Sequence, residues 1–172
     1  MDSLDTVNRG THNHEVGRAL AGAAALLTWL GWLTVCPVLG FPTLGTAAMV
    51  NRAIFGKIPE AGHDSGFWAG WVIVVAGLVV AIGVFFLLER AKLVRTSIGT
   101  GVIYGAVLWL AAGVVVMPLL GIIEPASPFP AKLDPMQATL MMYSLGPLAS
   151  VAALIAWVLF GAILGATGRA QK

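Results

Sequence analysis

Hydrophobic positions in this chain gather into four long runs, each bounded by charged residues. The charge-free windows lie between Arg18 and Arg52, Asp64 and Glu89, Arg95 and Glu124, and Asp134 and Arg169. Each window holds an apolar run long enough to cross a hydrocarbon core of about 30 Å as a helix. The pattern predicts an all-α, integral membrane four-helix bundle in one domain over residues 16–168. Its helices are expected at about residues 16–39, 67–88, 98–120 and 140–167.

The run Ile98–Leu120 shows the pattern most clearly, because it contains no Asp, Glu, Lys, Arg or His. Its length corresponds to about 34 Å of helix. Glycines recur along it at multiples of four residues, a spacing that lets two helix backbones approach closely in lipid. Similar steps occur in the second and fourth runs. The predicted helix-packing or partner-contact residues are Gly66, Gly70, Gly101, Gly105, Gly113, Gly161 and Gly165. The spacing leaves open whether they pack within the chain or against another subunit.

The segments outside the four runs carry weaker signals. Residues 1–15 are polar without an apolar period and predict a tail, and residues 169–172 form a short basic end. The first run is too long for a signal-peptide core, so we expect an uncleaved first helix. In the first loop, residues 42–56 place apolar side chains at helical spacing and predict a short helix lying in the membrane interface.

Proline positions refine these elements. Pro37 is expected in the last turn of the first helix, where a missing donor costs little. Pro147 is expected inside the fourth helix, where it predicts a kink. Four prolines in the loop over residues 121–137 predict a stiff, extended segment. The similar helix ends Val35–Gly40 and Val116–Gly121 indicate either a duplicated hairpin, giving two parallel repeats, or a coincidence between two apolar helix ends.

Composition supports a location in lipid. Of 172 residues, 58% are hydrophobic and 10% are charged, whereas soluble domains carry about 25% charged residues. The net charge is +2, but the ten Lys and Arg residues form no basic run with interleaved aromatic residues, so no nucleic-acid partner is expected.

Orientation follows from the distribution of Lys and Arg between the two sides of the membrane. If both termini lie inside, the inner side holds Arg9, Arg18, Arg90, Lys92, Arg95, Arg169 and Lys172, and the outer side holds Arg52, Lys57 and Lys132. This excess of basic residues on the inner side favours an N-in, C-in topology in a bacterial or archaeal cytoplasmic membrane.

Few residues offer chemistry. The three histidines, His12, His14 and His63, lie outside every predicted span, so we expect no intramembrane haem held by two histidines of this chain. His12 and His14 fit a solvated tail better than a loose surface metal site. His63 and Asp64 resemble an orienting pair without a nucleophile. The single cysteine, Cys36, excludes an internal disulfide. The sequence therefore predicts no catalytic, metal-binding or cofactor-binding residue.

Tryptophans are the remaining candidates for a binding role. The protein is expected to hold no cofactor of its own, but indole rings within the spans are candidates for the wall of a lipid, quinone or pigment site at a shared interface. These are Trp29, Trp32, Trp109 and Trp157.

Several segments resemble an uncharacterised family of small bacterial and archaeal four-helix integral membrane proteins. The similar segments are Arg95–Leu110, Val116–Gly121, Arg18–Gly22 and Phe160–Gly165. Members often have a histidine at the start of the second helix and another in the fourth. Here Phe67-Trp68 and Ser144-Leu145-Gly146 stand in those places, so the resemblance carries over no metal or haem role. Such genes are sometimes found near respiratory-chain genes, which implies an accessory role.

The sequence therefore predicts a non-catalytic accessory subunit of a larger membrane complex, with electron transfer, respiratory or photosynthetic, as the favoured class. Docking would use the Gly/Ala helix stripes, and the two long outer loops would cover the outer face of the partner. The alternative is a small homo-oligomeric channel or transporter for a neutral solute. A membrane enzyme using His63 and Asp64 is the least favoured interpretation.

Overall fold

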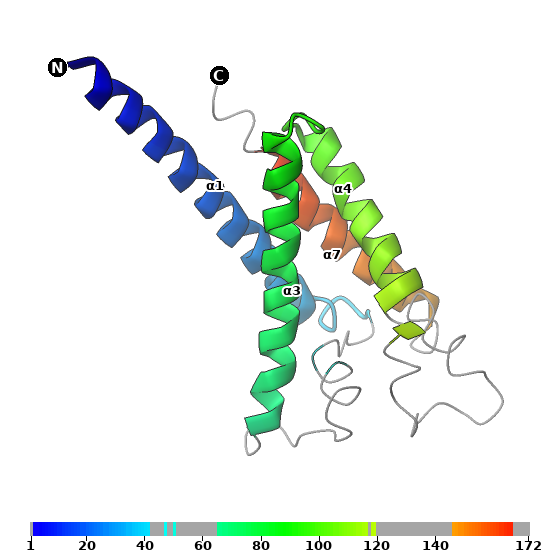
Figure 1. Ribbon diagram of the computed structural model, residues 1–172. Coiled ribbons are helices and arrows are strands. Elements are labelled where there is room, and N and C mark those ends of the chain that lie inside the picture. Colours follow the sequence, from blue (N-terminus) through cyan, green and yellow to red (C-terminus); the bar gives the residue numbers. More distant parts are fainter. Residues whose placement is uncertain are drawn as a thin grey trace.

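The computed structural model describes residues 2–41, 47, 50, 65–116, 118–119 and 146–166. For residues 2–14 and 65–67 it describes the backbone alone. All regular structure in these residues is helical (Figure 1). The elements are α1 (Asp2–Val35), α3 (Ser65–Arg90), α4 (Ile98–Ala111), the π-helix η1 (Ala112–Val116) and α7 (Pro147–Ala166). Four stretches of these residues are long and apolar enough to cross a membrane, which confirms the prediction of four apolar helices of spanning length.

Helix α1 differs from the prediction at both ends. It begins at Asp2, so helical backbone runs through the residues expected to form a tail. Residues 2–35 contain no proline, and nothing therefore stops the helix from continuing toward the N-terminus. The early turns project away from the other helices (Figure 1). The helix ends at Val35, before Pro37 and not beyond it, because a proline disfavours helical backbone in the preceding residue. Gly40 completes the turn with a φ of 81°.

Helix α7 begins at Pro147, so the predicted kink inside the fourth helix is wrong. Proline suits the first position of a helix, where its missing N–H has no intrahelical partner to lose. Gly146 precedes it with a φ of 91°, a conformation that L side chains rarely adopt, and this change of direction separates α7 from the chain before it. Residues 140–145, expected in the same helix, lie outside the described residues.

The hairpin of α3 and α4 agrees closely with the prediction. Helix α3 extends two residues beyond the expected range at each end. Helix α4 begins at Ile98 as expected, and the hydroxyl of Ser97 caps it by accepting a hydrogen bond from the backbone N–H of Thr100 at 3.1 Å. The α-helix gives way to a π-helix at Ala112, a change that the hydropathy pattern did not predict.

Helix α7 is the central element of the described structure. Within the most apolar 18-residue window of each candidate span, 44% of the residues are buried in α7, against 28% in α1 and 17% in α3 and α4. Alanine and glycine at its buried positions let α1 and α4 pack close to its backbone. The largest fully buried side chains are Phe85, Phe160, Leu78, Leu164 and Cys36.

Several predictions fall outside the described residues. These are most of the interfacial helix at residues 42–56, the pair His63 and Asp64, the proline-rich loop, the basic end and half of the second of the two similar helix ends. Of the interfacial helix, Ala47 and Val50 are described, and both have helical backbone.

Candidate functional site

The close contact of α4 with α7 sets the position of the site. A Cβ atom at Gly101 would overlap the backbone of Gly161, and one at Gly105 would overlap the carbonyl of Trp157. One at Gly165 would overlap the carbonyl of Ser97. The paired positions advance by four residues in opposite directions along the two helices, so α4 and α7 run antiparallel with their backbones touching.

Four of the seven predicted packing glycines therefore meet in this one contact inside the chain: Gly101, Gly105, Gly161 and Gly165. Gly113 is buried in η1 and Gly70 is buried in α3. The surroundings of Gly66 lie outside the described side chains. By contrast, a Cβ at Gly77 or Gly83 of α3 would meet no atom within 4 Å.

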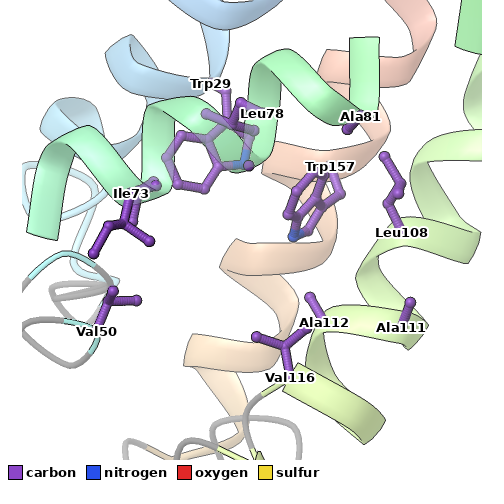
Figure 2. A pocket seen from close by; sticks show the side chains of 12 residues that line it. Trp29, Val50, Ile73, Leu78, Ala81, Leu108, Ala111, Ala112, Val116 and Trp157 are labelled. Atoms are coloured by element: carbon purple, nitrogen blue, oxygen red, sulfur yellow. The ribbon is translucent and has the colours of Figure 1, made fainter. Parts of the chain in front are cut away.

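An apolar cavity of about 340 Å³ lies next to this contact (Figure 2). Trp29 of α1 and Trp157 of α7 form part of its wall. Helix α3 contributes Ile73, Val74, Gly77, Leu78 and Ala81. Helix α4 and η1 contribute Leu108, Ala111, Ala112 and Val116, and Val50 completes the lining. The volume lies within the usual range for small-molecule sites, about 300–1,000 Å³.

The two tryptophans of the cavity lie against each other. Their ring centroids are 5.8 Å apart with the planes tilted by 58°. The ring of Phe160, fully buried, meets Trp157 edge-on at 5.6 Å and supports it from within α7. Trp29 is only 4% exposed, and its Nε1 is buried without a hydrogen-bond partner in the described structure.

The structure separates the four tryptophans expected to wall a binding site. Trp29 and Trp157 line the cavity, whereas Trp32 and Trp109 do not. Trp32 lies one turn further along α1 and donates from Nε1 to the carbonyl oxygen of Ala152 in α7 at 2.8 Å. Trp109 is half-buried and packs against the core.

Helices α3 and α4 both line the cavity. Tyr104 ties the two helices together on one side, donating its hydroxyl to the carbonyl oxygen of Ala81 at 2.6 Å. Away from the loop that joins them, the helices diverge (Figure 1). Along the diverging edges Ile73 and Val116 line the cavity and are 37% and 46% exposed. Both residues belong to candidate membrane spans.

The π-helix forms part of the wall through Ala112 and Val116. Such segments are rare and occur often at functional sites, because they displace side chains relative to an α-helix. Pro118 is the sequence feature that accounts for this change. Pro118 has no N–H to donate to the carbonyl of Val114, and its ring would clash with that carbonyl in a regular helix.

Charged groups in the described structure flank the cavity at a distance and do not line it. The guanidinium of Arg18 in α1 pairs with the carboxylate of Glu89 at the end of α3, with Nη2 and Oε2 3.1 Å apart. The same guanidinium lies 5.8 Å from the ring centroid of Phe86, and the hydroxyl of Thr96 donates to Glu89 Oε1 at 3.4 Å. This cluster joins the start of the α1 span to the end of the α3 span.

The described residues contain no group of three or more His, Cys, Asp or Glu side chains that could hold a metal ion. His12, His14, His63 and Asp64 lie outside the described side chains. The lining of the cavity consists of apolar side chains and two indole rings, so it offers contact with apolar surface.

No family model matches the sequence, and no match was found among the curated proteins or the solved structures. The fold and the cavity define the class: a helical protein with four candidate membrane spans and an apolar cavity among them. The resemblance to a family of small membrane proteins stays a prediction.

Proposed function

We propose that this protein is a non-catalytic membrane protein that holds a lipid-soluble ligand in the cavity walled by Trp29 and Trp157. The observation that carries the proposal is the cavity itself. It is large enough for a small molecule, its lining side chains are apolar or indole, and all of them except Val50 belong to the four candidate membrane spans. A ligand dissolved in the bilayer would enter sideways without crossing water.

The proposal extends to an accessory role in a larger membrane complex, with respiratory or photosynthetic electron transfer as the class, because such complexes use lipid-soluble carriers. The four spans would form a bundle in the bilayer, N-in and C-in. The glycines of α4 and α7 are already used inside the chain, so docking on a partner falls to the outward face of α3. That face is open at Gly83, and 17% of the α3 span is buried within the chain. The two long outer loops would cover the outer face of the partner.

Retention of a ligand tests the binding role. The isolated chain is purified in mild detergent and extracted with organic solvent, and the extract is analysed by mass spectrometry. We expect one lipid-soluble compound in near-stoichiometric amount. Gly77→Leu places a side chain at the cavity wall and should abolish retention. Gly83→Leu, on the same helix but away from the cavity, is the matched control and should retain the compound. Absence of any retained compound from the wild type would overturn the proposal.

Purification from native membranes tests the accessory role. Stoichiometric recovery with a larger complex, identified by mass spectrometry, is the expected result. Recovery of a homo-oligomer alone would contradict it, and solute flux through that oligomer in liposomes would establish the channel in its place.

A further inference from the structure

The turn that joins α3 to α4 carries an excess of positive charge. Arg90 ends α3, Lys92 and Arg95 follow it in the turn, and all three residues are exposed. The carboxylate of Glu89, just before the turn, is paired with the guanidinium of Arg18 at 3.1 Å. No Asp or Glu follows in the rest of the turn or in α4. Within the described residues, these three positive charges therefore have no carboxylate to balance them.

Lys92 has a left-handed backbone conformation, with a φ of 57°, and no other non-glycine residue in the described part of the chain has a positive φ. Its N–H donates to the carbonyl oxygen of Glu89 at 2.9 Å, and the N–H of Leu93 donates to that of Leu88 at 3.0 Å. This pair of bonds is the Schellman ending of a helix, where glycine is the usual residue because it has no Cβ. A lysine in this conformation costs free energy that a glycine would not. The fold alone therefore does not account for the lysine, and such an outlier points to a role of its side chain.

The turn lies between two candidate membrane spans, Trp68–Arg90 and Ile98–Val116. Only residues 91–97 separate them, so a turn this short stays at the surface of a bilayer that both spans cross. Leu93, between the basic residues, is 74% exposed. An exposed leucine among Lys and Arg suits that surface, because the leucine enters the apolar layer while long basic side chains extend to the headgroups. Anionic headgroups attract basic residues placed beside a membrane span.

We propose that the α3–α4 turn binds the headgroup of an anionic phospholipid, with Arg90, Lys92 and Arg95 supplying positive charge to its phosphate and Leu93 entering the apolar layer beside it. Guanidinium and ammonium groups are the usual partners of phosphate oxygens. The inference rests on the proposed location of the four spans in a bilayer and is independent of the ligand in the cavity. Basic residues at one end of the spans also orient a protein in its membrane. Orientation depends on the number of charges, however, and does not require one of them at a strained backbone position.

The test compares phosphatidylglycerol, which is anionic, with phosphatidylcholine, which is not. Native mass spectrometry of the full chain in a mild non-ionic detergent measures the affinity for the first molecule of each lipid. We expect the wild type to prefer phosphatidylglycerol by more than about tenfold. Replacing all three basic residues with glutamine (Arg90→Gln, Lys92→Gln, Arg95→Gln) should bring the preference to about one.

Lys92→Gly separates the lipid role from a structural one. It removes one positive charge and should lower the preference about fivefold. It also relieves the backbone, so its unfolding by sodium dodecyl sulfate should shift to a higher detergent fraction than that of wild type. Lys92→Arg keeps the charge and should keep the preference. Lys132→Gln, which removes one positive charge from a different loop of the sequence, is the matched control and should also keep it.

Four outcomes would overturn the inference. Equal binding of the two lipids by the wild type, or an unchanged preference in Lys92→Gly, would show that the turn does not select an anionic headgroup. An equal loss in Lys132→Gln would show that the preference follows net charge and not the turn. Loss of the preference when inorganic phosphate is added at the concentration of the lipid would assign the site to free phosphate. None of these results would affect the cavity, whereas removal of the chain from liposomes by alkaline carbonate would refute the bilayer location itself.

Discussion

The antiparallel contact between α4 and α7 predicts that Gly105→Ala destabilises the protein although it adds a single methyl group. The new Cβ would lie 2.8 Å from the carbonyl carbon of Trp157 and 3.2 Å from Cα of Val158, and closer still to the Trp157 carbonyl oxygen. Carbon atoms prefer separations of about 3.5–4.0 Å. The obstructing atoms are backbone, so no side chain can turn aside, and the helices must move apart by about 1 Å to restore ordinary contact.

The size of the effect follows from two opposing terms. Overpacking of this kind costs about 1–3 kcal/mol. Alanine in place of glycine within a helix returns roughly 0.5–1 kcal/mol. A net loss of about 1–2 kcal/mol is therefore expected for Gly105→Ala. Gly83→Ala gains the same helical term without a clash, because no atom lies within 4 Å of its Cβ, and it should be neutral or slightly stabilising.

Unfolding of the two variants in parallel gives the measurement. The protein in mild detergent is titrated with sodium dodecyl sulfate, and loss of tertiary structure is followed by tryptophan fluorescence. The transition of Gly105→Ala should fall at a lower detergent fraction than that of wild type, and the transition of Gly83→Ala should not. Equal transitions for the two variants would refute the backbone contact between α4 and α7.

Three further predictions concern other described contacts. The double variant Gly101→Ala, Gly161→Ala should lose less stability than the sum of the losses of the two single variants. The two residues touch, so one separation of the helices relieves both clashes. Additive losses would contradict the contact between them. Tyr104→Phe, measured by the same titration, should cost about 0.6–1.7 kcal/mol by removing the donor to the carbonyl of Ala81, and no change would show that the bond contributes nothing. Burial raises the pKa of the Cys36 thiol, which lies just after the α1 span, above its ordinary value. Because the thiolate is the reactive form, maleimide labelling should be slow near neutral pH and should accelerate only at a higher pH than for a free thiol. Labelling should become fast once the protein is unfolded. Fast labelling of the folded protein at neutral pH would show that the thiol is accessible.

The start of α4 could be predicted from local sequence, whereas the start of α7 could not. Ser97 ahead of Ile98 marks a helix start that the structure keeps, because the capping hydrogen bond lies within four residues. The hydropathy pattern predicts Pro147 in a helix interior, yet proline also suits the first position of a helix. The positive φ of Gly146 decides between the two, and that backbone conformation could not be read from hydropathy. Helix α1 ends before Pro37 because the residue that precedes a proline disfavours helical backbone.

For the candidate site, the sequence predicts the residue type that forms the wall but not which of the tryptophans form it. Indoles in the spans suggested a wall for an apolar ligand, but nothing in their spacing separates Trp29 from Trp32, which lie three residues apart on α1. The difference arises from α7, where the carbonyl of Ala152 meets the indole of Trp32 and the ring of Trp157 meets that of Trp29. The π-helix at the cavity wall is explained by Pro118, a residue that hydropathy does not distinguish from its apolar neighbours.

The amino-acid sequence by itself determined that this is a helical protein with four stretches able to cross a membrane, and that glycine spacing suits close helix contact. These properties depend on the length and composition of continuous segments, and the thickness and apolarity of a bilayer act on each segment separately. The tertiary structure alone decided that α4 and α7 use their glycines on each other, that α3 diverges from α4, and that a cavity forms between them around two indoles. Those outcomes depend on which faces of distant helices meet, and hydropathy carries no information about that choice because all faces of such helices are apolar.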